Sequence, residues 1–99
     1  MTTEQFVSRH AALCWKILYG SRLENAQFIA FARNHELALR RCAADWEIYT
    51  RQKFGFPGSF AYFSRIEGGC VERVSVGLGG VYWLVPVALH CRKQENNDE

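Results

Sequence analysis

Histidine and cysteine supply the first candidate chemistry, because His10 and Cys14 lie four residues apart. On a helix this spacing places both side chains on one face, where they could offer two ligands to zinc. His90 and Cys91 are adjacent, so on a strand they would point to opposite faces and only one could join. The chain has no C-x-x-C or H-x-x-x-H pair. We therefore expect no metal site, and we interpret Cys14 as a small core residue.

Nucleophilic catalysis is the second candidate chemistry. All four cysteines (Cys14, Cys42, Cys70 and Cys91) fall on apolar stripes or beside valines, and buried thiols are unreactive. The chain has no G-x-S-x-G, P-loop or G-x-G-x-x-G motif. The glycines of 77–80 precede a predicted strand rather than a helix, so they indicate a turn and not a phosphate cradle. We expect no enzyme activity and no cofactor.

Basic and aromatic side chains supply the third candidate chemistry, which is binding. Arg33, Arg40 and Arg41 would form a basic edge on a predicted helix. Acidic residues from Glu36 to Glu47 alternate with the arginines, which is typical of a solvated helix face held by ion pairs. The sequence contains no known DNA- or RNA-binding signature. Nucleic-acid binding is therefore the less favoured interpretation of these residues.

The elements that would carry these residues change type once, at 54–58, where the hydrophobic period changes from three or four to two. Before this point we predict helices at about 3–19 and 22–50. Capping boxes at Thr2-x-x-Gln5 and Ser21-x-x-Glu24 would begin them, and Gly20 would end the first in the left-handed region. The two helices would form a hairpin with a very short turn.

The second predicted helix carries one continuous apolar stripe. Its members recur every three or four residues: Phe28, Phe31, His35, Leu39, Cys42, Trp46 and Tyr49. The stripe crosses Asn34 without changing phase, which favours one long helix. A kink or break near Asn34 is the alternative.

After 58 we predict three antiparallel strands, at about 59–67, 70–76 and 81–91. Gly68 and Gly69 would form a two-residue hairpin turn that pairs Arg65 with Glu72. Pro86 cannot donate to a ladder, so it would belong on an edge strand.

In this register the sheet has two apolar faces. The face that we expect to pack on the helices carries Ala61, Phe63, Val74, Val76, Val81, Trp83, Val85 and Val87. The opposite face includes Phe60, Tyr62, Tyr82 and Leu84, and an exposed apolar patch of that size on a small protein marks an interaction site. The alternative is that a helix lies across Tyr62 and Tyr82. That arrangement would bury the patch and leave the arginine face as the surface to test.

Composition and charge set the class of protein. The 99 residues are 48% hydrophobic, which is enough for one cored domain at 1–94. Residues 1–94 carry twelve basic and seven acidic side chains, while 95–99 form an acidic tail that we expect to be flexible. We find no export signal and no apolar run long enough for a membrane helix, so we expect a cytoplasmic protein with reduced thiols.

Together these patterns predict an α+β fold: an N-terminal helical hairpin with a long second helix, packed on a C-terminal three-stranded antiparallel β-meander. The expected function is non-enzymatic binding to a larger host protein complex, as an adaptor or inhibitor. Small domains of this kind are common among phage and mobile-element accessory proteins. The predicted contact residues are Tyr62, Tyr82, Phe60, Leu84, Arg33, Arg40 and Arg41. Weak single-stranded nucleic-acid binding by the same aromatics and arginines is the alternative, and homodimerisation through the sheet is a third hypothesis.

Overall fold

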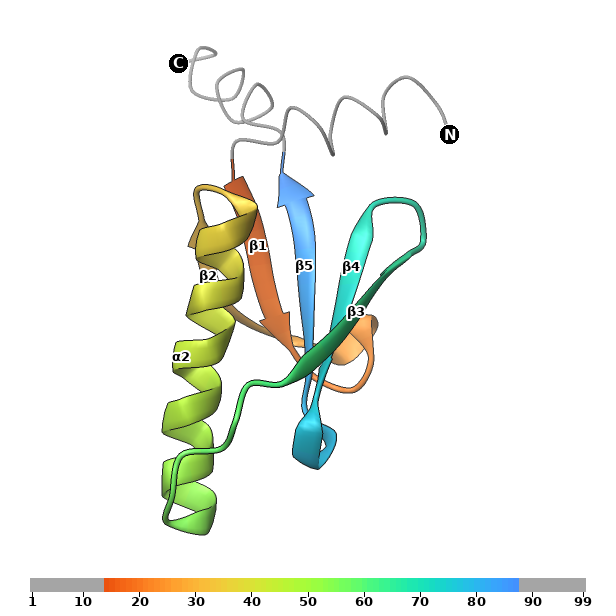
Figure 1. Ribbon diagram of the computed structural model, residues 1–99. Helices are drawn as coiled ribbons and strands as arrows, with labels where there is room; N and C mark the ends of the chain where they lie inside the picture. Colours follow the sequence, from red (N-terminus) through yellow and green to blue (C-terminus); the bar gives the residue numbers. More distant parts are fainter. Residues whose placement is uncertain (1–13, 88–99) are drawn as a thin grey trace.

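The computed structural model describes residues 14–87, which form one α-helix and one antiparallel sheet of five strands (Figure 1). The elements in chain order are β1 (Cys14–Tyr19), η1 (Leu23–Asn25), β2 (Gln27–Ala32), α2 (His35–Phe54), β3 (Tyr62–Glu67), β4 (Val71–Val76), η2 (Gly77–Gly79) and β5 (Val81–Val87). The strand order is β2-β1-β5-β4-β3, so β5 is central and β2 and β3 are the edges. Within 14–87 no helix has the length and apolar character needed to span a bilayer.

The core lies between α2 and one face of the sheet. The helix contributes Ala38, Cys42 and Trp46, and the strands contribute Trp15, Ile17, Val74, Val76, Tyr82 and Leu84. On the strands these residues alternate with side chains on the opposite face, as expected from the two-residue period of a strand.

The predicted helical hairpin on a three-stranded meander is wrong, because the described residues contain one helix and five strands. Residues 14–19 form β1, which lies between the edge strand β2 and the central strand β5. Trp15, Ile17 and Tyr19 occupy alternate positions of β1 and face α2. Pairing of β1 with both β2 and β5 outweighs the local helical spacing of its apolar residues. Gly20 is extended, with φ of 159°, and its N–H donates to the carbonyl of Val81 at 3.1 Å.

Residues 22–34 also differ from the predicted second helix. The Ser21-x-x-Glu24 sequence precedes only the short η1, which has no side-chain cap bond, and β2 follows it. The helix begins after Asn34, whose side chain accepts a hydrogen bond from the N–H of Leu37 at 2.9 Å. The break near Asn34, which was the alternative, matches this start. Gly55 ends the helix in the left-handed region, with φ of 86°.

A β-bulge explains why β2 looked helical. Ile17 pairs with Ala30 and Leu18 with Phe28, so Ile29 is an extra residue in β2. In a regular strand, residues three apart point to opposite faces, but the bulge brings Phe28 and Phe31 to the same face. Their ring centroids are 5.1 Å apart. The spacing of three therefore imitated a helical stripe.

The C-terminal strands do run as a meander, but in a different register from the predicted one. Arg65 lies opposite Arg73 rather than Glu72, and residues 68–70 form a three-residue turn. A shift of one residue exchanges the faces of a strand. Val74 also pairs with Tyr82, so the face with Tyr82 and Leu84 lies under α2, while Trp83 and Phe63 lie on the opposite face.

Pro86 lies on the central strand and not on an edge. It is opposite Trp15 of β1, whereas the pairing between β4 and β5 extends only as far as Leu84. Pro86 is thus beyond the β4 ladder, where a missing N–H breaks no ladder bond on that side.

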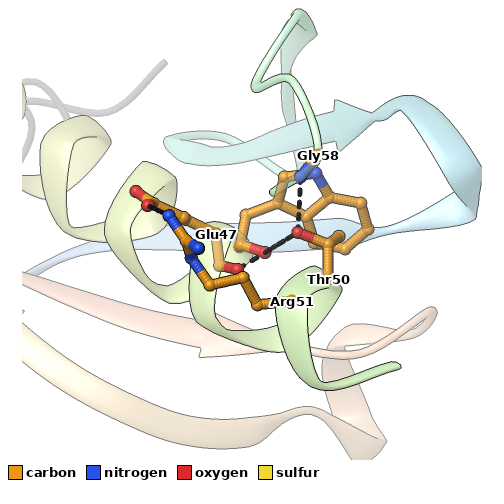
Figure 2. A network of polar contacts seen from close by, with 5 residues as sticks. Glu47, Thr50, Arg51 and Gly58 are labelled. Carbon is orange, nitrogen blue, oxygen red and sulfur yellow. Dashed lines mark hydrogen bonds and ion pairs between the residues drawn. The ribbon is translucent and has the colours of Figure 1, made fainter. Parts of the chain in front are cut away.

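The segment from Gly55 to Ala61, which leads from α2 to β3, is fixed by one hydroxyl (Figure 2). Thr50 is fully buried, donates to the carbonyl of Trp46 at 2.9 Å and accepts from the N–H of Gly58 at 2.6 Å. A Cβ on Gly58 would lie 2.9 Å from the Thr50 methyl, so the approach requires glycine.

Several predicted features fall outside the described residues. They are His10, His90 and Cys91, the Thr2-x-x-Gln5 box, the helix before 14, the end of the third strand at 88–91 and the tail at 95–99.

Candidate partner-binding groove

The structure places the four predicted sheet anchors in two settings. Tyr82 and Leu84 are fully buried beneath α2, at 0% exposure. Phe60 is half-buried against the same core, and Tyr62 is 44% exposed on the edge strand β3. Because Tyr82 and Leu84 are buried, they cannot contact a partner. The helix therefore covers this part of the predicted patch, and the arginine face is the surface left to test.

The Tyr82 side chain has a clear structural partner. Its hydroxyl donates to Asp45 Oδ2 at 2.6 Å. Burial raises the pKa of Tyr82 well above its usual value, and the hydrogen bond and charge of Asp45 raise it further. The phenol therefore stays protonated and ties the centre of α2 to the central strand.

The structure brings Arg33, Arg40 and Arg41 together around one groove of about 470 Å³. Its remaining lining is mainly apolar: Phe31 and Ala32 from β2, and Leu37 and Ala44 from α2. In Figure 1 this position is where β2 ends and the first turns of α2 begin. We call it the arginine groove.

Local structure positions each part of the arginine groove. The Asn34 cap turns the chain sharply, so that residues at the end of β2 face the first turns of α2. Positions 37, 40, 41 and 44 then share one helix face, since residues three and four apart are neighbours on a helix. The groove is therefore formed by a strand end and a helix start that adjoin in the sequence.

The charge of the groove is only partly compensated. Arg40 donates to Glu36 Oε2 at 2.8 Å, an exposed i,i+4 pair. Arg33 and Arg41 are both exposed and form no ion pair with another residue in 14–87. Two positive charges beside an apolar floor favour a ligand that combines negative charge with apolar side chains.

Phe28 and Phe31 extend the apolar surface around the edge strand. Each is 52% exposed, and the rings contact each other at 5.1 Å on the sheet face that α2 does not cover. Lys16 lies opposite Phe31 on the neighbouring strand β1. The groove and this aromatic pair together form one apolar and basic surface along β2.

Two further reactive features in 14–87 are a buried cysteine and a histidine–glutamate pair. Cys42 is fully buried, and burial together with the charges of Asp45 and Glu72 raises the pKa of its thiol to about 12. His35 Nε2 lies 2.6 Å from Glu72 Oε1, but neither residue lines the cavities at Phe31, Tyr49 or Trp83. No group of three or more His, Cys, Asp or Glu in this range could hold a metal ion.

A cavity of about 460 Å³ on the other face has Trp83 in its lining. Its charges are largely satisfied within the chain, since Arg65 pairs with Glu67 at 2.7 Å and Arg73 donates to Ser75. The arginine groove is therefore the stronger candidate for binding an external acidic group.

No known family model, curated protein or solved structure matches this chain. The functional proposal therefore rests on the geometry of the groove.

The sequence pattern predicts the three arginines as contact residues but not their apolar neighbours in the groove. It places Phe28 and Phe31 on a buried helical stripe and gives no role to Leu37. The available signal was the run Gln27–Ala32, rich in aromatic and β-branched residues, directly before an Asn that can cap a helix.

Proposed function

We propose that this chain is a non-enzymatic binding protein that uses the arginine groove to occupy an acidic surface of a larger protein, as an adaptor or inhibitor. The observation that carries the proposal is the convergence of Arg33, Arg40 and Arg41 on an apolar groove. Interfaces are typically centred on apolar and aromatic contacts, with arginine enriched among the residues that contribute most. Localisation in the cytoplasm, which is part of the proposal, agrees with the reduced thiols of Cys14 and Cys42.

The test compares two charge-matched double variants of the full chain. Arg33→Gln with Arg41→Gln removes the uncompensated charges of the groove. Arg22→Gln with Arg51→Gln removes two exposed arginines that lie outside it. We expect wild type and the second variant to retain a protein partner from native lysate, identified by mass spectrometry, and the groove variant to lose it. Equal retention by both variants would contradict the proposal.

The alternative is weak binding of single-stranded nucleic acid, favoured by the half-exposed Phe28–Phe31 pair beside Lys16 and the groove. A salt titration separates the two functions. Binding to nucleic acid should weaken steeply, in proportion to the phosphates neutralised, whereas a protein interface that combines a few arginine contacts with apolar contacts should weaken less. Release of the captured material by nuclease would identify the alternative directly.

A further inference from the structure

A further cavity, of about 300 Å³, lies along the line where β2 and α2 meet, on the side of the arginine groove toward the start of β2. We call this line the seam. The lining of the cavity includes Tyr19 of β1, Ile29 of β2, and Asp45, Ile48 and Tyr49 of α2. It has no basic residue in its lining, in contrast to the arginine groove. We call it the tyrosine pocket.

The chemistry of the tyrosine pocket suits a cation. Asp45 forms no ion pair with another residue in 14–87, and only its Oδ2 accepts the Tyr82 hydroxyl. Tyr19 and Tyr49 also line the pocket, and their rings contact each other with centroids 6.0 Å apart. A carboxylate next to aromatic faces attracts lysine and arginine side chains through an ion pair and cation–π contacts. Lys53 Nζ already lies 5.7 Å from the centre of the Tyr49 ring, although Lys53 does not line the pocket.

Electrostatics of the neighbouring groups agree with this preference. Burial raises the pKa of the Tyr19 phenol, and the negative charge of Asp45 contributes to the same shift. Burial disfavours any charge at this position, but the negative charge of Asp45 favours a bound ammonium or guanidinium group.

The two sites lie at a spacing that one extended peptide could span. Leu37, Arg41, Ala44 and Ile48 follow each other at helical spacing along the side of α2 that meets β2, so the groove and pocket share one stripe. From Arg41 to Tyr49 the helix rises about 12 Å, at roughly 1.5 Å per residue. An extended chain covers that distance in about four residues. β2 is an edge strand, so a strand can be added beside it.

We propose that the seam binds an extended partner segment whose acidic residue meets the arginine groove, and whose lysine or arginine, about three or four residues away, enters the tyrosine pocket. This inference rests on the proposed function and defines the chemistry of its partner. The partner motif is therefore an acidic and a basic residue at fixed separation, with apolar residues between them to meet the seam.

The test selects binders from a displayed library of random linear peptides on the immobilised full chain. Selected peptides are then measured by fluorescence anisotropy against wild type and Asp45→Asn. Asparagine still accepts the Tyr82 hydrogen bond, and thermal unfolding confirms that the variant folds. We expect enrichment of acidic and basic residues about three or four apart. Replacing the peptide lysine by norleucine should weaken binding to wild type about tenfold, and binding to Asp45→Asn less than twofold.

Each other outcome has a distinct meaning. Peptides that need Arg33 and Arg41 but respond to neither norleucine nor Asp45→Asn would overturn this inference and leave the proposed function standing. Failure to select any peptide, or selection of peptides indifferent to the groove arginines, would overturn this inference, and the lysate capture decides the proposed function separately. Sedimentation over a concentration series tests whether a second copy of the chain occupies the seam instead. A dimer that Ile48→Lys dissociates would show that it does and would overturn this inference.

Discussion

The link between Thr50 and Gly58 offers a sharp test of how the chain returns from α2 to the sheet (Figure 2). Thr50→Val keeps the shape of the side chain but removes the hydroxyl. The N–H of Gly58 would then lose its 2.6 Å acceptor, and the 2.9 Å bond to the Trp46 carbonyl would also disappear. Thr50 is fully buried, so water cannot replace these bonds readily.

The magnitude follows from those contacts. A lost hydrogen bond together with a partly buried donor left unpaired costs about 2 kcal/mol of unfolding free energy. In a domain of this size that corresponds to a fall of about 10 °C in melting temperature. Thr50→Ser is the matched control, since it keeps the hydroxyl and loses only a buried methyl, which costs about 1 kcal/mol.

Thermal unfolding followed by circular dichroism measures the global effect, and amide hydrogen exchange of Gly58 measures the local one. We expect Gly58 to lose protection in Thr50→Val and to keep it in Thr50→Ser. If Thr50→Val melts with or above Thr50→Ser and Gly58 stays protected, the hydroxyl does not anchor the return segment.

Two further predictions concern the core. Because the pKa of Cys42 rises from 9.0 when unfolded to about 12 when folded, only the unfolded state releases this proton near pH 10. The contribution of this thiol to stability is therefore present below pH 9 and is lost as pH rises toward 12, with about 1 kcal/mol lost by pH 10. Urea unfolding at pH 7 to 10 should show this fall, and Cys42→Ala should remove that part of it. Gly80→Ala would place a Cβ 2.5 Å from the Trp46 ring, so it should lower the free energy of unfolding by about 1–3 kcal/mol. Gly77→Ala is the control, because its Cβ would have nothing within 4 Å and should leave the melting temperature almost unchanged. Equal melting temperatures of the two variants would refute the close contact.

The helix could be predicted from the sequence over most of its length, because its apolar stripe is real from His35 to Tyr49. The N-terminal error arose where strands imitate helices. Cys14, Ile17 and Leu18 are spaced as on a helix, but β1 alternates through Trp15, Ile17 and Tyr19. Only pairing with distant partners decides between these patterns, and β1 pairs with β5, more than sixty residues away.

The sheet faces could not be predicted because two glycines do not define a loop length. Gly68 and Gly69 both adopt positive φ, at 55° and 93°, which suits a two-residue turn as well as the three-residue turn that forms. The extra residue shifts Arg65 opposite Arg73 and exchanges the faces of β3 relative to β4. The arginines of the candidate site escaped this error because Arg33, Arg40 and Arg41 surround the Asn34 cap and depend on no strand register.

The bulge at Ile29 explains why β2 was predicted as helix, and it also shapes the candidate site. An unbulged β2 would direct Phe28 and Phe31 to opposite faces, and one of them would turn toward α2. The extra residue instead places both rings, each half exposed, on the open face beside Lys16. It also leaves Ile29 packed against the core and lining the tyrosine pocket. Bulges commonly redirect side chains at sheet edges near functional sites. Here the irregularity that hid β2 from pattern analysis also gives the seam its apolar surface, so deletion of Ile29 should disturb partner binding and the packing of β2 together.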